Sequence, residues 1–427
     1  MTRYIIEGRK ILEGRVKISG NKNAILPCLA ASLLTGEEVV LKNVPMISDV
    51  RVLTEILMQF GAKVETRDQE VKVKCSKIKN SVLTQQLASK LRASILLVGP
   101  LLARTGKIEF FHPGGDVIGK RDINLHLEGF RQLGCKVSVN DHNYKVLKGT
   151  NVMSDARIFL EIATVTGTEN LILASVIRKG RTVIRNAACE PHVIDLCLML
   201  ISMGASIEGI GTSTLTIDGV EKLRGTEFTI GSDNIEFGTY AIAAAITGGE
   251  IEIENCHNLD LEPVIWPLSK MGVSITRGER VIKVSAKKIA AISKLITNVW
   301  PGFPTDLMSV MIVLATQARG ISLLHDWVYE SRMFFVDKLI SMGANITIAD
   351  PHRVLISGPT RLFGRNLETP DIRAGMALVL AALVAEGKSI INRAELIERG
   401  YEDVVGKLVG LGANIQRMEI ANGNGSQ

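Results

Sequence analysis

One arrangement of apolar and polar positions recurs six times along this chain. In each copy, a run with helical spacing of apolar residues ends at a glycine, and a segment of alternating residues follows. These two periodicities distinguish helices from half-buried strands, so each copy predicts the end of a helix and the start of a strand. The six glycines are Gly61, Gly134, Gly204, Gly272, Gly343 and Gly412, separated by 73, 70, 68, 71 and 69 residues. This nearly constant period predicts one structural unit of about 70 residues, repeated six times.

A second recurring pattern lies between these glycines. An Ala- and Leu-rich helical run ends at a glycine before an extended segment of β-branched residues, and these glycines are Gly36, Gly106, Gly180, Gly249, Gly320 and Gly387. Glycine tolerates the left-handed conformation that ends many helices, so we predict this conformation at all six positions. Each unit is thus predicted to run helix, strand, helix, strand. Runs such as 240–247 are apolar on every side, which predicts that these helices are buried.

The predicted fold class is α/β, with two domains. A chain of 427 residues is too long for one hydrophobic core, and six units divide into two domains of three. Clefts between domains often hold small-molecule sites, so we expect the active site there. Hydrophobic residues make up 46% of the chain and aromatic residues only 4%, so aliphatic side chains must fill the cores. The tail at 422–427 is rich in Asn and Gly, and we expect it to be disordered.

Composition disfavours several classes of function. The longest apolar stretches, such as 376–385, span about ten residues, whereas a membrane helix needs about 20. The N-terminus lacks the organisation of a signal peptide, so we expect a cytoplasmic protein. Six scattered cysteines argue against a disulfide framework and against a zinc site, and we expect no metal. The formal net charge is a modest +6 and aromatic residues are few, which argues against nucleic-acid binding.

Basic residues gather in loops beside small residues, where an anion can approach the backbone. Lys22 stands in the segment 20–24, near the predicted start of the first helix, whose free N–H groups favour an anion. The other loops of this kind contain Arg92, Arg121, Arg332, Arg373 and Arg399. The planar, permanently charged guanidinium group of arginine suits phosphate and carboxylate. Each residue alone also fits a surface salt bridge, so it is their joint occurrence that predicts an anion site.

Taken in order, these loops make the chain resemble the enolpyruvyl transferases over residues 4–418. The segments that carry the resemblance are 20–24, 91–94, 112–115, 303–306, 371–374 and 399–401. The resemblance implies an inside-out α/β barrel of two domains with three units each, which agrees with the six copies counted above. It places one domain at 22–231, with the loop of Asp116, and the other at 1–21 together with 232–427. It implies no cofactor and no metal.

The resemblance also implies a reaction and its residues. The family transfers the enolpyruvyl group of phosphoenolpyruvate to a hydroxyl group by addition, followed by elimination of phosphate. The match is to members whose acceptor is the 3-hydroxyl of UDP-N-acetylglucosamine, at the first committed step of peptidoglycan synthesis. By resemblance, the catalytic residues are Lys22, Asp116, Asp306 and Arg399. The substrate-binding residues are Lys22, Asn23, Arg92, Arg121, Asp122, Ile123, Asn124, Leu125, Asp306, Val328, Arg332, Asp371, Arg373 and Arg399.

Asp306 and Asp116 have different implied roles. Asp306 would take the proton of the acceptor hydroxyl as a general base, although a cap of a helix beginning at Leu307 is an alternative role. Asp116 stands where most family members carry a cysteine, on a loop thought to deliver a proton to phosphoenolpyruvate. Nearby substrate charges favour the protonated carboxyl that this donation needs, and a solvated loop residue is the alternative. Fosfomycin alkylates the family's thiolate, so a carboxylate here predicts insensitivity to the drug.

Four further positions depart from the family's usual residues. Asp122 replaces a usual proline, Asn124 an aspartate and Thr166 a glycine, and Asn234 stands where a basic residue is common. Three of these positions lie in the region expected to hold the nucleotide, so an enolpyruvyl transferase with another nucleotide acceptor is an alternative. The shikimate-pathway enzyme and a catalytically weak protein that binds a UDP-sugar are further alternatives. Protein partners and oligomeric state are not predicted.

Overall fold

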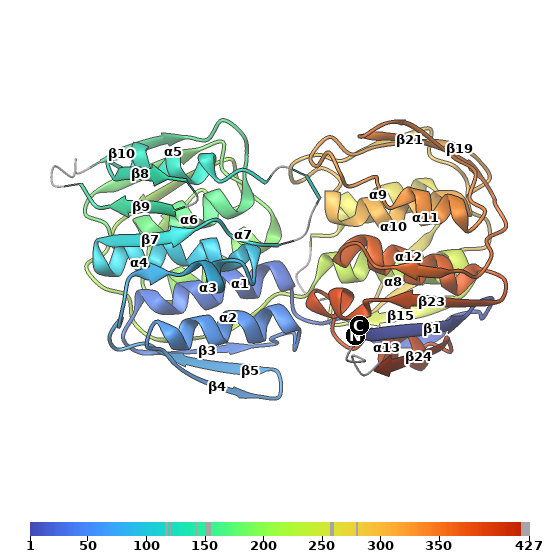
Figure 1. The fold of residues 1–427 in the computed structure, drawn as a ribbon, viewed down its shortest axis with the longest axis horizontal. Coiled ribbons are helices and arrows are strands. Elements are labelled where there is room, and N and C mark those ends of the chain that lie inside the picture. Colours follow the sequence, from blue (N-terminus) through green and yellow to red (C-terminus); the bar gives the residue numbers. More distant parts are fainter. Residues whose placement is uncertain are drawn as a thin grey trace, which may run out of the picture. The chain divides into compact units, whose positions relative to one another are not determined.

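Two compact units make up the chain in the computed structural model (Figure 1). The structure describes residues 1–115, 118–119, 121–141, 143–149, 155–256, 260–278 and 281–419. Unit 1 contains Met1–Ser19, Val117–Lys120 and Ser232–Gln427, and unit 2 contains Gly20–Asp116 and Arg121–Gly231. Asp116 and the tail at 422–427 lie outside the described residues.

The described part of unit 2 holds three sheets of four strands. In spatial order they are β14 (Thr226–Thr229), β3 (Glu38–Lys42), β5 (Glu70–Lys74) and β4 (Lys63–Arg67); β6 (Val82–Leu83), β7 (Lys107–Phe111), β9 (Asn143–Leu147) and β8 (Lys136–Asn140); and β10 (Ala156–Phe159), β11 (Arg181–Arg185), β13 (Thr214–Asp218) and β12 (Ser206–Glu208). In each sheet the first pair is parallel and the other two pairs are antiparallel. The helices of unit 2 are α1 (Lys22–Ala31), α2 (Ser48–Gln59), α3 (Gln85–Ala88), α4 (Val98–Thr105), α5 (Asn124–Gln132), α6 (Val165–Ser175) and α7 (Pro191–Ser202), with the short 3-10 helices η1 (Ser32–Leu34) and η2 (Arg92–Leu97).

Unit 1 repeats this plan, again with three four-stranded sheets among its described residues. They are β22 (Asn366–Glu368), β23 (Lys388–Asn392), β1 (Thr2–Glu7) and β24 (Asn414–Glu419); β2 (Glu13–Lys17), β15 (Glu250–Glu254), β17 (Val281–Ser285) and β16 (Ser274–Arg277); and β18 (Lys294–Ile296), β19 (Gly320–His325), β21 (Arg353–Gly358) and β20 (Ile346–Asp350). Its helices are α8 (Asn234–Thr247), α9 (Glu262–Lys270), α10 (Met308–Thr316), α11 (Val336–Ser341), α12 (Ile372–Val384) and α13 (Val404–Gly410), with the 3-10 helices η3 (Thr305–Leu307) and η4 (Ala394–Arg399). Strands from both ends of the chain share these sheets, because β1 pairs with β23 and β24 and β2 pairs with β15.

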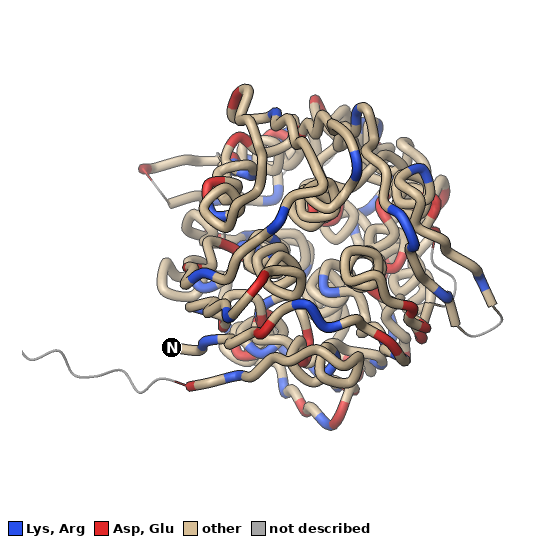
Figure 2. The backbone as a smooth tube through the Cα atoms, turned by 90° about the vertical axis from the view of Figure 1, so that its right-hand side faces the viewer, with Lys and Arg blue, Asp and Glu red and all other residues tan. Residues whose placement is uncertain are grey.

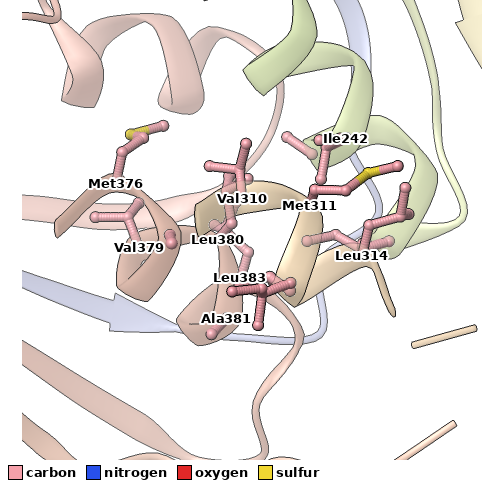
Figure 3. Packing of buried hydrophobic residues seen from close by; sticks show 14 of the residues in the cluster. Ile242, Val310, Met311, Leu314, Met376, Val379, Leu380, Ala381 and Leu383 are labelled. Carbon is pink, nitrogen blue, oxygen red and sulfur yellow. The ribbon is translucent and has the colours of Figure 1, made fainter. Parts of the chain in front are cut away.

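Each unit has its own hydrophobic core, built around helices that are buried on all sides. In unit 1 every residue of α10 is buried, and α8 is buried from Asn234 to Ile246, as the apolar run predicted. Figure 3 shows side chains of α8, α10 and α12 packing together, among them Ile242, Met311 and Leu380. A separate cluster in unit 2 is built from α1, α4 and α6 in the same way. These inner helices have no polar face, because sheets and other helices cover them on every side.

The glycine predictions hold at most positions but not at all of them. Gly106, Gly180, Gly320 and Gly387 have positive φ angles, whereas Gly36 and Gly249 do not. At the end of α8 the left-handed residue is Gly248, with φ of 69°. Gly249 is required for a different reason, because a Cβ atom there would lie 1.9 Å from the carbonyl oxygen of Leu12.

The predicted unit of two helices and two strands also omits two strands. Each observed sheet adds a parallel edge strand and the second strand of a hairpin. Edge strands such as β6 (Val82–Leu83) are too short to show an alternating pattern. The hairpin β4–β5 turns at Asp68, a non-glycine residue with φ of 51°, so the sequence carries no glycine signal there.

Hydrogen bonds hold the chain where it passes between the units, after Ser19 and after Gly231. In unit 1, Ser19 N donates to Glu236 Oε2 at 2.8 Å. Lys407 Nζ contacts both Ser19 Oγ at 2.6 Å and Glu236 Oε1 at 2.5 Å. In unit 2, Asn21 N donates to Gly231 O at 2.7 Å. The segment that leads to Lys22 is therefore fixed to the rest of each unit on both sides of the first crossing.

Lys and Arg residues are interspersed with Asp and Glu residues along the backbone in the view of Figure 2. Among the described residues, none of the helices is both long enough and apolar enough to cross a membrane.

Candidate active site

The predicted site residues fall into two groups, one in each unit. Unit 2 carries Lys22, Asn23, Arg92 and residues 121–125, and unit 1 carries Asp306, Val328, Arg332, Asp371, Arg373 and Arg399. The structure brings several members of each group into direct contact, as described below. Asp116, the predicted acid, belongs to the part of the chain outside the described residues.

Lys22 is the first residue of α1, where a positive charge is electrostatically unfavourable. Asn21 caps this helix, because its side-chain oxygen accepts from the backbone N of Asn23 at 2.8 Å and of Ala24 at 3.2 Å. The first turn contains no acidic residue. A cation at the positive end of a helix dipole costs about 0.3–1 kcal/mol. Only 9% of Lys22 is exposed, and its Nζ lies 3.1 Å from Oδ2 of the buried Asp49 in α2, which balances its charge.

Arg92 holds the segment 121–125 in place. Its Nη2 donates to the carbonyl oxygen of Arg121 at 2.6 Å. A Cβ atom at Gly115 would lie 2.7 Å from Cβ of Arg92 and 3.4 Å from Nη1 of Arg121, so only glycine fits between these arginines. Asp122 and Asn124 bond to each other: the side chain of Asp122 accepts from Asn124 N at 2.9 Å and from Asn124 Nδ2 at 2.7 Å. The two unusual residues of this loop therefore stabilise the start of α5 together.

A buried chain of hydrogen bonds fixes the hydroxyl group of Thr166, another unusual residue. Asn170 Oδ1 accepts from Gly99 N and Asn170 Nδ2 donates to Ile95 O, both at 2.8 Å, which fixes the amide orientation. The other amide hydrogen then points at His126 Nδ1, 3.1 Å away, which must accept it. Burial lowers the pKa of His126 to about 3, so the neutral ring carries its hydrogen on Nε2. Nε2 lies 3.2 Å from Thr166 Oγ1 and donates to it, which leaves the hydroxyl hydrogen of Thr166 directed elsewhere.

In unit 1, Asp306 lies between two buried guanidinium groups. Its Oδ1 is 3.2 Å from Arg332 Nη2, and its Oδ2 is 2.9 Å from Arg373 Nη2 and 3.1 Å from Arg373 Nε. Arg332 and Arg373 are 2% and 5% exposed, whereas the Asp306 side chain is 28% exposed. The carboxylate is thus held in one orientation while part of it stays accessible. The helix α10 begins at Met308, and among the described residues no side-chain cap is found at its N-cap, Leu307, so the helix start lends no support to the alternative role of Asp306 as a cap.

Both arginines remain charged despite their burial. Burial acts to lower the pKa of Arg373, but the charge of Asp306, together with a contribution from Tyr401, outweighs it and the net shift is upward. The pKa of Arg332 is raised in the same way, by Asp306 and Asp371 against burial. Arg373 Nη1 and Arg332 Nε are buried and have no hydrogen-bond partner within the described ranges. Buried donors are normally paired, so these groups are suited to an anion.

Asp371 holds the backbone of Arg373 by capping the helix that carries it. Its side-chain oxygen caps α12 by accepting from Arg373 N at 2.9 Å and from Ala374 N at 3.0 Å. The guanidinium group of Arg373 lies over the ring of the buried Tyr401, 5.1 Å from its centroid. Helices α1 and α12 therefore each begin with a polar cap followed by a cation in the first turn.

The remaining predicted residues of unit 1 lie on short segments that follow regular elements. Arg399 is half-buried and ends η4, two residues before Tyr401. Val328 follows β19, and its backbone N donates to Asp326 Oδ1 at 3.0 Å. The sequence did not single out Asp326, Asp49, His126 or Asn170. No motif signalled them, since each acts through a partner that only the fold brings close.

Among the described residues, no group of three or more His, Cys, Asp or Glu side chains is arranged to hold a metal ion. The chemistry available in the two groups is that of cations, one partly exposed carboxylate and hydrogen-bond donors. Cations and donors of this kind can bind a small, highly charged anion in either group, and the group in unit 1 can also move a proton at Asp306.

Comparison with known proteins shows similarity to one enzyme family along nearly the whole chain. The family described as EPSP synthase (3-phosphoshikimate 1-carboxyvinyltransferase) matches residues 6–408. Curated proteins named UDP-N-acetylglucosamine 1-carboxyvinyltransferase from Borreliella burgdorferi and Treponema denticola are 47% and 45% identical to this chain, with 98% of it and 100% of each relative covered.

Solved structures extend the likeness to the fold. The enolpyruvyl transferase NikO from Streptomyces tendae has a TM-score of 0.87 at 23% identity, covering 98% of this chain and 99% of that one. EPSP synthase from Acinetobacter baumannii has a TM-score of 0.76 at 17% identity, covering 98% and 100%. These similarities confirm the predicted α/β fold class.

Proposed function

Because this chain belongs to the enolpyruvyl transferase family, we propose that it transfers the enolpyruvyl group of phosphoenolpyruvate to the 3-hydroxyl of UDP-N-acetylglucosamine and releases phosphate. The acceptor follows from the full-length relatives, which carry this activity in their names at 40–47% identity. The reaction would be the first committed step of peptidoglycan synthesis. It would take place in the cytoplasm, and cell shape and division would depend on it.

The observation that carries the proposal is the placement of Asp306 between Arg332 and Arg373. An ionised carboxylate with part of its surface accessible can accept the proton of the acceptor hydroxyl. When phosphoenolpyruvate binds to the guanidinium group of Arg332 or Arg373, its negative charge competes with Asp306 for the positive charge of that group. This competition makes the carboxylate a stronger base when phosphoenolpyruvate is present.

Binding of phosphoenolpyruvate is assigned to the cations. Its phosphate and carboxylate need several positive groups, and we assign Lys22, Arg121 and Arg399 to them, supported by Arg92, Arg332 and Arg373. Lys22 and Arg373 stand in the first turns of helices, where a positive charge is unfavourable, and ion pairs with Asp49 and Asp306 offset this cost. The assigned residues come from both units.

The acceptor is assigned to residues beside these cations. We propose that Asn23 and Asp306 hold the amino sugar and that Val328 contacts the nucleotide, together with Arg121, Asp122, Ile123, Asn124 and Leu125. Asp371 acts by holding the first turn of α12. Thr166, with its hydroxyl hydrogen directed away from His126, presents a donor that a glycine lacks.

The chemistry proceeds in two steps. Asp306 takes the proton of the acceptor's 3-hydroxyl while the oxygen of that hydroxyl forms a bond to C2 of phosphoenolpyruvate. A proton from Asp116 adds to the methylene carbon C3. The product is a tetrahedral ketal. In the second step Asp116, now a carboxylate, takes a proton back from C3, the double bond forms again, and the bond between C2 and the phosphate oxygen breaks. The proton that Asp306 took from the 3-hydroxyl passes to the departing phosphate. Protons and electrons balance over the cycle, and neither metal nor cofactor takes part.

Asp116 also determines the response to fosfomycin. A carboxylate is a far poorer nucleophile toward an epoxide than a thiolate, so the protein should be insensitive to the drug. Potent time-dependent inhibition, or a covalent adduct at Asp116 in a mass spectrum, would contradict this assignment.

A phosphate-release assay with phosphoenolpyruvate and a panel of acceptors tests the proposed reaction. We expect release with UDP-N-acetylglucosamine and not with other nucleotides or with 3-phosphoshikimate. Release only with another nucleotide would replace the acceptor, and no release with any acceptor would favour a protein that binds a UDP-sugar without turnover. The variant Asp116→Asn tests the proton donor, because full activity would exclude that role.

A further inference from the structure

Asp326 is a fully buried carboxylate beside the candidate site, and it has no role in the chemistry described above. It directly follows β19 and is 0% exposed. Within the described part of the chain, no Lys or Arg forms an ion pair with its side chain. A buried polar group is tolerated only when hydrogen bonds satisfy it, so the partners of the Asp326 carboxyl group indicate what it does.

Those partners come from three separate segments. Oδ2 accepts from the hydroxyl of Thr305 at 2.5 Å, and Oδ1 accepts from Val328 N at 3.0 Å and from the hydroxyl of Thr297 at 3.2 Å. Thr305 begins η3 and directly precedes Asp306. One carboxylate thus joins the turn that carries Asp306 to the segment that carries Val328, which lies more than 20 residues further along the chain.

The backbone of Asp326 is itself fixed. Its N donates to the carbonyl oxygen of His352 at 2.8 Å, and its own carbonyl oxygen lies 2.6 Å from His352 Nδ1. The neighbouring Trp327 donates from Nε1 to the carbonyl oxygen of Thr297 at 2.7 Å. The backbone that carries the Asp326 carboxylate is therefore fixed, so a change in the hydrogen bonds of the carboxylate must move Thr305 or Val328 rather than Asp326.

The side chain of Asp306 is already oriented by two arginines, but they do not fix the backbone from which it projects. No side chain caps η3 at its start, at Pro304. The bond from Thr305 to Asp326 supplies the missing constraint. Because the hydroxyl hydrogen of Thr305 is committed to a carboxylate, this charge-assisted bond is also stronger than a bond between neutral groups.

We propose that Asp326 is a positioning residue that sets the distance between the base Asp306 and the acceptor-contacting segment at Val328. This inference rests on the proposed function, since it assigns Asp326 to the alignment of the acceptor hydroxyl with its base. Loss of the link should lower kcat. A misplacement of about 1 Å costs on the order of 100-fold in rate, so a partial loosening should cost about 10- to 100-fold.

The test uses three single variants of the full chain and one double variant. Thr305→Val removes the hydroxyl at constant shape, Thr305→Ser keeps it, and Asp326→Asn keeps the volume but loses one acceptor. We expect kcat to fall about 10- to 100-fold in Thr305→Val and in Asp326→Asn, with KM for phosphoenolpyruvate changed by less than about twofold. Thr305→Ser should retain nearly full kcat. The double variant Thr305→Val with Asp326→Asn should be no slower than the slower single variant, because both remove the same link.

Thermal unfolding of each variant separates positioning from stability, with kcat measured well below every midpoint. Unchanged kcat in Thr305→Val, additive losses in the double variant, or an equal loss in Thr305→Ser would each overturn the inference. If Asp326→Asn does not fold, the two Thr305 variants still decide. A wild-type protein that releases no phosphate with UDP-N-acetylglucosamine overturns the proposed function and this inference with it, whereas an active wild type with unaffected variants overturns the inference alone.

Discussion

Replacement of Lys407 by methionine should destabilise unit 1 strongly. Methionine has a similar length but no charge, so Glu236 and Ser19 lose their shared partner. The side chains of Lys407 and Glu236 are only 15% and 4% exposed, so water cannot replace the lost contact fully. Removal of one partner of a buried ion pair costs about 3–5 kcal/mol. In a unit of this size each kcal/mol lowers the melting temperature by about 2–4 °C, so we expect a fall of about 6–20 °C.

The loss should also grow as pH rises. Burial raises the pKa of Glu236 above its ordinary value, and Lys407 opposes that rise. Without Lys407 the pKa of Glu236 rises further, so the native state keeps a proton that the unfolded chain releases above about pH 4.3. The native state then binds more protons than the unfolded state across this window, and stability falls with increasing pH. The variant should be closest to wild type at pH 4.5 and furthest from it at pH 8.

Differential scanning calorimetry at pH 4.5 and pH 8 measures both effects. The double variant Lys407→Met with Glu236→Gln should recover much of the loss, because no buried charge remains. Arg277→Met removes an exposed ion pair with Glu262, whose side chains are 51% and 74% exposed, and should cost less than about 1 kcal/mol. Equal shifts for Lys407→Met and Arg277→Met, or a shift independent of pH, would refute this reasoning.

Three further predictions concern the candidate active site. Asp306→Asn should lower kcat by about 100- to 10,000-fold with little change in KM for the acceptor, and a steady-state assay in which only KM changes would remove the base role. Asp116→Cys should gain time-dependent inactivation by fosfomycin, which preincubation assays and intact-protein mass spectrometry detect, and continued insensitivity would show that the side chain is not the determinant. Thr166→Val should raise KM for UDP-N-acetylglucosamine by about 5- to 10-fold, as expected for one lost hydrogen bond, while Thr166→Ser should not. Equal KM values for these two variants would show that the hydroxyl oriented by His126 does not contact the acceptor.

The repeated architecture could be read from the sequence because the repeat period and the apolar runs are local signals. The run around Tyr240 predicts a buried helix directly, since no polar stripe interrupts it. Strand number was underestimated because β6 has only two residues and pairs with a strand more than 20 residues away. The position of Gly249 was misinterpreted because its requirement arises from Leu12, a contact between segments distant in sequence.

The candidate site shows the same division between local and distant signals. Lys22 and Arg373 could be found because a cation beside a helix start is visible in a short segment. The chain from Asn170 through His126 to Thr166 could not, since His126 lies on α5 and the other two residues on α6, and since its direction depends on burial. Asp326 resembles any other acidic residue in the sequence, and only its hydrogen bonds to Thr305 and Val328 distinguish it.

The pairing of β1 with β23 and β24, near the far end of unit 1, has a consequence for synthesis on the ribosome. Unit 2 ends its sequence at Gly231 and can fold while translation continues. Strand β1 emerges first but pairs with β23 and β24, so it must wait for the last part of the chain. At about 5–20 residues per second this delay after Gly231 is roughly 10–40 s. Strand β1 is therefore made early and is among the last to pair, and a chaperone would find it unpaired throughout that interval.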